Sequence, residues 1–258
     1  YGGHTEDLVA KGKSFYYYGR VMESLDKVED AMTFYLKAKA VLENSQEYKL
    51  LGLMSEGLGN LNRKQKLFDA ALINFRTSLQ FYSKMPDSLG ISFAYRNIGR
   101  VFLYNEQLDS AYYYFDKALH IADIKKYPSV SSMLLEVGVV HRSAGDYLGA
   151  ESYFLSFIEQ ERNENNLYSG YLALGNLYLY MNRLEDAKMY LALCLKSPNL
   201  VIKRDACECL YDLEKELDNF KGAIGYKDIA DSLRIITQDI DIQNSIATLQ
   251  SRYNSEKW

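Results

Sequence analysis

Two arginines one helical turn apart are the residues of this sequence best suited to bind an anion. Arg96 and Arg100 are four positions apart, so on a helix both guanidinium groups lie on the same face. A guanidinium group can donate two parallel hydrogen bonds to one carboxylate. We therefore predict a binding site for a ligand that carries a carboxylate, and that site requires a helix to present both arginines together.

Tyrosine is the second type of residue that could serve binding, with 23 copies among the 258 residues. Three consecutive residues span most of a helical turn, so the runs 16–18 and 112–114 cannot turn every ring toward a core. Some of these rings are expected at a binding surface, where tyrosine offers apolar area with a polar tip. Alternatively, most of them pack between neighbouring elements with the hydroxyl group at the rim.

No arrangement of residues indicates catalysis or a bound metal. The chain has three histidines and three cysteines, which are His4, His120, His141, Cys194, Cys207 and Cys209. None of the histidines belongs to an HExxH motif, and no phosphate-binding loop is present. The odd number of cysteines gives no disulfide framework, and no histidine or cysteine cluster completes a zinc site. We predict a protein that is not an enzyme and that has no cofactor and no metal.

Composition narrows the classes of partner. The net charge is −4, with 30 basic and 34 acidic residues, which argues against nucleic acid or an anionic membrane as a partner of this segment. No apolar run reaches the roughly 18 residues that a membrane span needs. Because the sequence begins with Tyr1 rather than Met, we expect the natural N-terminus to lie upstream.

A ladder of small residues indicates how the candidate side chains are positioned. Alanines recur at spacings of 36 to 40 residues, at Ala31, Ala71, Ala111, Ala150, Ala187 and Ala223. A glycine precedes each of the first five by twelve residues, at Gly19, Gly59, Gly99, Gly138 and Gly175. Tyr211 takes the place of the sixth glycine. A repeat of this length predicts a stacked array of similar units.

Each unit reads as two helices joined by a short turn. In the third unit, Tyr95, Ile98 and Phe102 form an apolar stripe, and a second stripe begins at Ala111 after a polar turn. The first unit has the equivalent stripe, Phe15, Tyr18, Gly19 and Met22. We expect the glycine and the alanine of each unit to lie where its two helices approach most closely, since a larger residue would push them apart.

This pattern resembles the tetratricopeptide repeat (TPR) family over roughly residues 12–230. The family's tryptophan is replaced here by Phe15, Tyr95 and Tyr171, and its closing proline survives only as Pro86, Pro128 and Pro198 at shifted positions. The resemblance implies an all-α fold, a right-handed α-solenoid of about six helical hairpins followed by a long C-terminal helix. It divides the chain into an N-terminal extension or partial helix (1–11), a superhelical array (12–230) and a capping or connecting helix (231–258).

The resemblance also implies a concave groove lined by the first helix of each hairpin, where a protein or peptide ligand binds. The positions that face this groove carry Tyr16, Arg20, Asn60, Arg63, Arg96, Arg100, Tyr104, Arg142, Asn176 and Tyr180. The basic residues among them suit a carboxylate-bearing peptide. Alternatively, the arginines pair with Glu23 and Glu56 across the groove and bind nothing.

The last 28 residues follow a different pattern. Ile235, Ile242, Ile246, Leu249 and Tyr253 are spaced by 7, 4, 3 and 4 residues, which is a heptad-like seam on one long helix. This helix either caps the last hairpin, or it forms a homodimer through residues 231–258 or connects to a following domain.

The C-terminal sequence also resembles the end of extracytoplasmic TPR regions in membrane-spanning transcriptional regulators and sensor kinases of Bacteroidetes. That resemblance implies the sensory or interaction region of a signalling protein, in the periplasm, with a membrane span beyond Trp258 as its only membrane contact. Two alternatives remain open: a free-standing soluble scaffold or adaptor, and a cytoplasmic peptide-sensing regulator.

Overall fold

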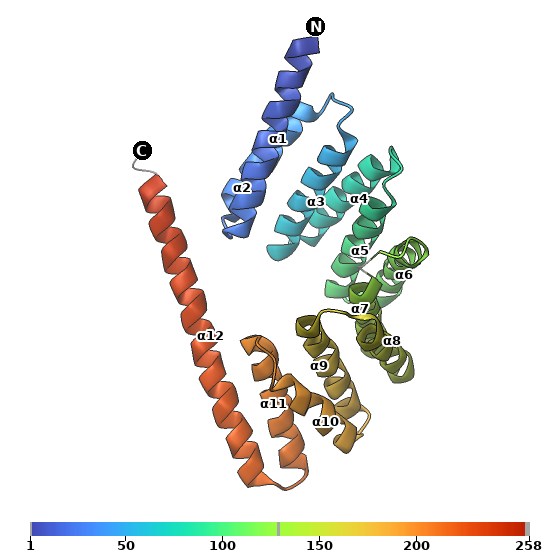
Figure 1. Cartoon of the computed structure of the whole chain (residues 1–258), viewed down its shortest axis with the longest axis vertical. Coiled ribbons are helices and arrows are strands. Elements are labelled where there is room, and N and C mark those ends of the chain that lie inside the picture. The colour runs from blue at the N-terminus through green and yellow to red at the C-terminus, as the bar shows by residue number, and fades with distance from the viewer. Residues whose placement is uncertain (1, 128–129, 256–258) are drawn as a thin grey trace. The chain divides into compact units, whose positions relative to one another are not determined.

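The computed structural model describes the backbone of residues 2–127 and 130–255, and the side chains of residues 7–127, 130–240 and 242–243. Throughout these described ranges the chain is helical with no β-strand (Figure 1). Several residues discussed above have side chains outside the described residues: His4, Pro128, Ile246, Leu249, Tyr253 and Trp258.

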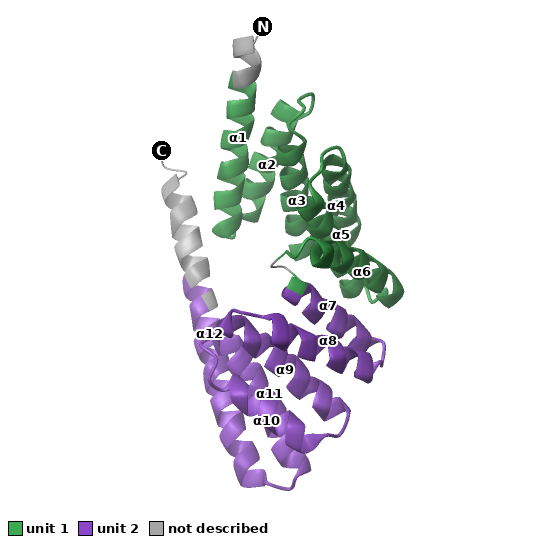
Figure 2. Cartoon of the chain, turned by 45° about the vertical axis from the view of Figure 1, so that its right-hand side comes forward, with its two compact units in different colours: residues 1–130 green, residues 131–258 purple. Residues whose placement is uncertain are grey.

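The chain divides into two compact units, residues 1–130 and 131–258 (Figure 2). The helices of the first unit are α1 (Gly2–Ser24), α2 (Val28–Leu42), α3 (Tyr48–Lys64), α4 (Phe68–Ser83), α5 (Ser88–Tyr104) and α6 (Leu108–Ile124). Those of the second unit are α7 (Val130–Ser143), whose first residue belongs to the first unit, α8 (Tyr147–Gln160), α9 (Glu164–Tyr180), α10 (Leu184–Cys194), α11 (Leu200–Glu216) and α12 (Phe220–Ser255). Successive pairs form hairpins 1 to 6, from α1–α2 to α11–α12, so the predicted all-α architecture of helical hairpins is confirmed.

The turn inside every hairpin has the same backbone geometry. One residue with positive φ stands five positions before the ladder alanine, and these residues are Asp26, Lys66, Glu106, Gly145, Asn182 and Asp218. The following amide N–H donates to a carbonyl five residues back, as from Lys27 to Met22 and from Leu67 to Asn62. This is the Schellman pattern that ends a helix at a left-handed residue. The sequence repeat is therefore also a repeat of chain reversals.

The small residues of the ladder lie where the two helices of a hairpin meet, as predicted. All six ladder alanines are at most 2% exposed. A Cβ atom at Gly59 would lie 2.6 Å from the Phe75 ring, and one at Gly138 would lie 2.4 Å from the Phe154 ring. Each of these rings stands four residues after a ladder alanine. The glycine thus makes room for a side chain of the second helix.

The sixth hairpin lacks this glycine and packs differently. Tyr211 occupies its position, and the residue four after Ala223 is Lys227 instead of a large apolar residue. The Lys227 ammonium lies 5.9 Å and the Lys215 ammonium 5.7 Å from the centre of the Tyr211 ring. Both contacts fall in the range of cation–π interactions. In this hairpin a tyrosine thus replaces the glycine, and a lysine replaces the large apolar residue that packs against the glycine in the other hairpins.

The expectations for Tyr18 and for the two divisions of the chain have different outcomes in the structure. In α1, Tyr18 was expected on the apolar stripe, yet it is 56% exposed and stacks on Phe34, while Tyr16 is 5% exposed. The expected core position was therefore wrong for Tyr18, because its ring stacks on Phe34 of α2 and remains largely exposed to solvent. The proposed divisions at 11–12 and 230–231 fall inside the continuous helices α1 and α12, and their functional meaning stays a prediction.

Neither a candidate membrane span nor a candidate metal site is found among the described residues. No helix there combines the length and the apolar character that crossing a membrane requires. No group of three or more His, Cys, Asp or Glu side chains in the described ranges is arranged to hold a metal ion.

The contact between glycine and ring generates a stability prediction. Gly59→Ala should lower the stability of the first unit by about 1–3 kcal/mol, the typical cost of overfilling a packed core, because its Cβ would overlap Phe75. Gly225→Ala in α12 is the matched control, since a Cβ there meets nothing within 4 Å. Thermal unfolding followed by circular dichroism measures both, and equal melting temperatures for the two variants would contradict the packing argument.

Candidate functional site

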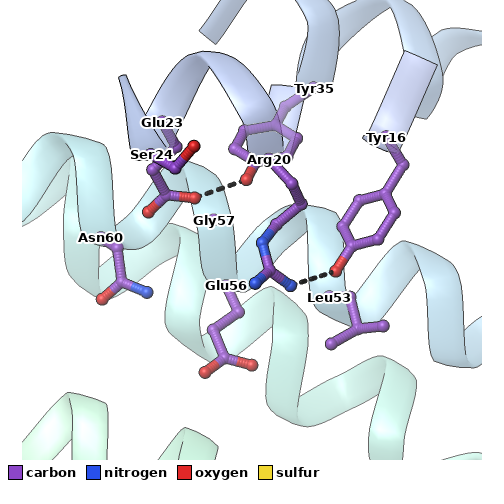
Figure 3. Close-up of a pocket in the computed structure, with 9 residues that line it drawn as sticks. All are labelled: Tyr16, Arg20, Glu23, Ser24, Tyr35, Leu53, Glu56, Gly57 and Asn60. Atoms are coloured by element: carbon purple, nitrogen blue, oxygen red, sulfur yellow. Dashed lines mark hydrogen bonds between the residues drawn. The ribbon is translucent and has the colours of Figure 1, made fainter. Parts of the chain in front are cut away.

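A pocket of about 360 Å³ opens between hairpins 1 and 2. Its walls come from α1, α2 and α3, and the residues that line it are Tyr16, Arg20, Glu23, Ser24, Tyr35, Leu53, Glu56, Gly57 and Asn60 (Figure 3). Three of the predicted groove residues, Tyr16, Arg20 and Asn60, therefore lie together. The pocket combines one cation, two carboxylates, an amide and an apolar wall.

Arg20 supplies the positive charge of the pocket. Its side chain is exposed, and its Nη1 donates to the hydroxyl oxygen of Tyr16 at 3.1 Å (Figure 3). That hydrogen bond is the main reason why the pKa of Arg20 is raised above its usual value. Tyr16 is itself buried, and its ring packs 6.0 Å from the Tyr35 ring. The guanidinium group is thereby held at the pocket while most of its N–H donors remain for other partners.

The two carboxylates of the pocket are held by neutral donors. The Tyr35 hydroxyl donates to Glu23 Oε2 at 2.5 Å. Glu56 accepts from the Tyr82 hydroxyl at 3.1 Å and from the Asn97 amide at 3.0 Å. The sequence left open that arginines pair with Glu23 and Glu56; among the described residues neither carboxylate forms such a pair. Arg20 hydrogen-bonds to Tyr16 instead, although its charge still acts on Glu56 and lowers the pKa of that carboxyl, and whether the arginines bind a ligand stays a prediction.

Burial shifts the ionisation of these groups. Desolvation is the first cause of a raised pKa at Glu56, and the hydrogen bonds from Tyr82 and Asn97 oppose it. Desolvation also raises the pKa of Tyr35 and Tyr82, so both hydroxyl groups stay protonated as donors. A carboxylate with a raised pKa is one that lacks full compensation for the water it has lost.

The other predicted residues of the first unit lie outside this pocket. Tyr104 is 61% exposed, and its ring stacks on Phe68 with 6.5 Å between the ring centres. The Arg63 guanidinium lies 5.7 Å from the same ring. Arg96 and Arg100 are half-buried on α5. Tyr104 therefore matches the alternative in which tyrosines pack between hairpins, and the role of both α5 arginines stays a prediction.

The remaining predicted residues belong to the second unit. Tyr180 is 68% exposed and stacks on Tyr147. The Asn176 amide oxygen accepts from the Cys209 thiol at 2.8 Å, and Arg142 is half-buried on α7. Burial raises the pKa of Cys209 to about 12, so the thiol is protonated at neutral pH. The structure gives Tyr180 a ring contact and Asn176 a hydrogen bond, and the role of both residues in ligand binding stays a prediction.

Two polar residues of the pocket, Ser24 and Tyr35, were missed in the sequence, whereas Glu23 and Glu56 were expected across the groove only as partners of the arginines. Glu23 and Glu56 occupy groove positions of the repeat, so the register could have included them as ligand-binding groups. No spacing rule indicates Tyr35, because its ring lies in the core and only its hydroxyl reaches the site.

Comparisons with known proteins agree with the fold. No family model matches the sequence. A curated relative, the uncharacterized protein ycf37 of Guillardia theta, is 25% identical over 126 residues, which are 49% of this chain and 67% of that protein. The crystal structure of PilW, a widely conserved type IV pilus biogenesis factor, matches with a TM-score of 0.69 at 18% identity and covers 84% of this chain and 90% of its own.

A second solved structure is made of TPR-like repeats. It contains the TPR-like repeats of a kinesin light chain of Podosopora anserina, with a TM-score of 0.60 at 11% identity, and it covers 70% of this chain and 91% of its own. At these identities the likeness concerns the fold. The chain has the α-solenoid fold of TPR proteins.

The raised pKa of Glu56 generates a pH-dependent stability prediction. A folded-state pKa above the unfolded one means that the ionised carboxylate destabilises the fold at neutral pH, and that protonation relieves this cost as the pH falls. Glu56→Gln keeps the shape and an acceptor for Asn97. It should raise the melting temperature at pH 7 by about 1–3 °C, and the gain should vanish below the ordinary pKa of glutamate.

Calorimetry at several pH values measures this difference. Asp116→Asn, at an exposed carboxylate in the middle of α6, is the control and should change the melting temperature equally little at every pH. A Glu56→Gln variant less stable than the wild type at pH 7 would show that the carboxylate stabilises the fold.

Proposed function

We propose that this chain is a non-catalytic protein-interaction scaffold that binds a carboxylate-bearing protein or peptide at the pocket between hairpins 1 and 2. The observation that carries the proposal is the set of hydrogen-bond partners of Arg20 and of the two pocket carboxylates. Its guanidinium lines the pocket with Tyr16 as its hydrogen-bond partner, while both pocket carboxylates are bound by Tyr35, Tyr82 and Asn97. A ligand carboxylate is the partner that such a group fits best.

Neighbouring groups support the same ligand. Asn60 lines the pocket with an amide that can donate a hydrogen bond, and the Ser24 hydroxyl, which donates to the Val21 carbonyl, can accept one. Leu53 and the rings of Tyr16 and Tyr35 provide apolar contact. A few polar groups placed around an apolar wall are typical of ligand pockets. The groove residues Arg63, Arg96 and Arg100 on α3 and α5 would extend this site along the first unit.

Arg20→Ala tests the proposal directly. A library of peptides with free carboxyl ends, compared with the same peptides amidated, identifies ligands whose binding needs the carboxylate. Arg20→Ala should weaken those ligands about tenfold or more, because a hydrogen bond to a charged group contributes about 1.5–3 kcal/mol. Arg96→Ala combined with Arg100→Ala should weaken them as well if the site extends to α5.

Arg76→Ala on the exposed face of α4 is the control for the loss of one arginine and should leave binding intact. Affinities come from fluorescence anisotropy at a fixed salt concentration. If free and amidated peptides bind equally well, or if Arg20→Ala binds like the wild type, the carboxylate site does not exist.

A second proposal concerns α12, through which we infer that the chain forms a homodimer. This helix has 36 residues, against 17 in its partner α11. Ala223, Ala230 and Leu233 are buried, whereas Ile235 is 60% and Ile242 is 56% exposed. These two isoleucines are the described part of the heptad-like seam, and a repeat of seven favours pairing of helices.

The wider context rests on the resemblance of the C-terminal sequence to the Bacteroidetes regulators. It supports a role as the sensory region of a membrane-spanning transcriptional regulator or sensor kinase, with the array in the periplasm and α12 as the connection to the next segment. A free-standing adaptor and a cytoplasmic peptide-sensing regulator are the competing roles. A dimerising α12 is compatible with the first role because paired helices can transmit a change to a following domain.

Charged residues on the seam should separate the copies. Ile235→Lys combined with Ile242→Lys should give a monomer by sedimentation equilibrium under conditions in which the wild type is a dimer, and should keep the helical circular dichroism of the wild type, since both side chains are exposed in the single chain. Ile73→Lys on α4, where the isoleucine is 66% exposed, is the matched control and should stay dimeric. A wild type that is monomeric at every concentration refutes the dimer.

A further inference from the structure

The charge balance of the pocket between hairpins 1 and 2 differs from that of a simple carboxylate site. Arg20 contributes one positive charge, whereas Glu23 and Glu56 contribute two negative ones. A carboxylate ligand alone would use Arg20 and would add a third negative charge beside both glutamates. Like charges at this range repel, and the repulsion is stronger where water is partly excluded. A carboxylate ligand therefore does not account for the presence of Glu23 and Glu56 in the pocket.

Glu56 is the more informative of the two. It is half-buried on α3, and its oxygens accept from two neutral groups, the Tyr82 hydroxyl and the Asn97 amide. Removing a carboxylate from water is costly unless a cation compensates for it. The pKa of Glu56 is raised because this desolvation cost outweighs the opposing effects of Tyr82, Asn97 and the nearby charge of Arg20. The two neutral donors also fix the position of the carboxylate, so it is ready for a cation at the pocket.

Glu23 offers a second acceptor from the opposite wall. Its Oε2 is bound by Tyr35, and among the described residues its Oε1 has no donor. Figure 3 shows Glu23 on α1 and Glu56 on α3, with the side chain of Arg20 also at the pocket. Acceptors and a cationic donor thus line one space of about 360 Å³, which lies in the range of small-ligand pockets.

We infer that the group that enters this pocket is zwitterionic: its carboxylate binds Arg20, and its ammonium group binds Glu23 and Glu56. This inference rests on the proposed function for the contact with Arg20 and adds the cation to it. The same chemistry has two sources, a free α-amino acid and a peptide whose carboxyl end is a lysine. In both cases the aliphatic carbons lie against Leu53 and the tyrosine rings.

Two matched sets of probes test the inference by isothermal titration calorimetry. The amino-acid set is L-leucine, N-acetyl-L-leucine and L-leucinamide. The peptide set is acetyl-Ala-Ala-Lys, the same peptide with norleucine in place of lysine, and acetyl-Ala-Ala-Lys amide. In each set the first probe has both charges, the second has only the carboxylate, and the third has only the ammonium group.

In at least one set the zwitterion should bind at least tenfold more tightly than both single-charge probes, and that set names the source. Glu56→Gln and Glu23→Gln should each bring the zwitterion close to the affinity of the carboxylate-only probe. Arg20→Ala should weaken the binding of both the zwitterion and the carboxylate-only probe. Asp116→Asn should leave all affinities unchanged, and melting curves establish that each variant is folded.

The outcomes separate this inference from the proposed function. Equal binding of the zwitterion and the carboxylate-only probe in both sets overturns the inference and leaves the carboxylate site in place. Binding that requires only the ammonium group overturns both. Absence of binding by every probe overturns the inference, while the peptide library still tests the carboxylate site independently.

Discussion

The packing of tyrosine rings into spaces left by glycine connects the core of the first unit to its pocket. A Cβ atom on Gly19 or Gly57 would lie 2.7 or 2.6 Å from the ring of Tyr35. The same ring carries the hydroxyl group that binds Glu23. Tyr82 repeats the arrangement between Gly52 and Gly90, with its hydroxyl on Glu56. The side chains that join the hairpins thus also hold the pocket carboxylates, so packing and site geometry depend on one set of contacts.

The carboxylates of the two units show how this arrangement differs from ordinary structural ion pairs. In the second unit Glu214 accepts from Lys188 at 2.7 Å, and Glu151 accepts from Arg183 at 2.7 Å. Lys188 is the first cause of a lowered pKa at Glu214. Glu56 has neutral partners and a raised pKa. Glu214 and Glu151 are thus hydrogen-bonded to cations of their own, whereas the hydrogen-bond partners of Glu56 are both neutral.

The sequence predicted the hairpins well because one small-residue ladder sets both the turn and the close contact of each pair. It also placed Tyr16, Arg20 and Asn60 together, since residues at equivalent positions of neighbouring repeats share one face. It could not assign Tyr104 to the Phe68 stack, because that contact depends on how one hairpin packs against the next. The neutral partners of Glu56 were missed for the same reason: Tyr82 and Asn97 lie 26 and 41 residues away in the chain.

The position of the pocket between two hairpins has a consequence for dynamics. Its walls belong to separate repeats, so the pocket exists only while α1 and α2 remain docked on α3. Repeat arrays open locally at such junctions because each repeat contacts only its neighbours. A ligand that bridges Arg20 and Glu56 would bind the docked form alone, and its binding free energy would add to the stability of this junction. Occupancy of the pocket would then slow hydrogen exchange in α1 and α2. Binding of the ligand would thereby make the array more rigid at this junction.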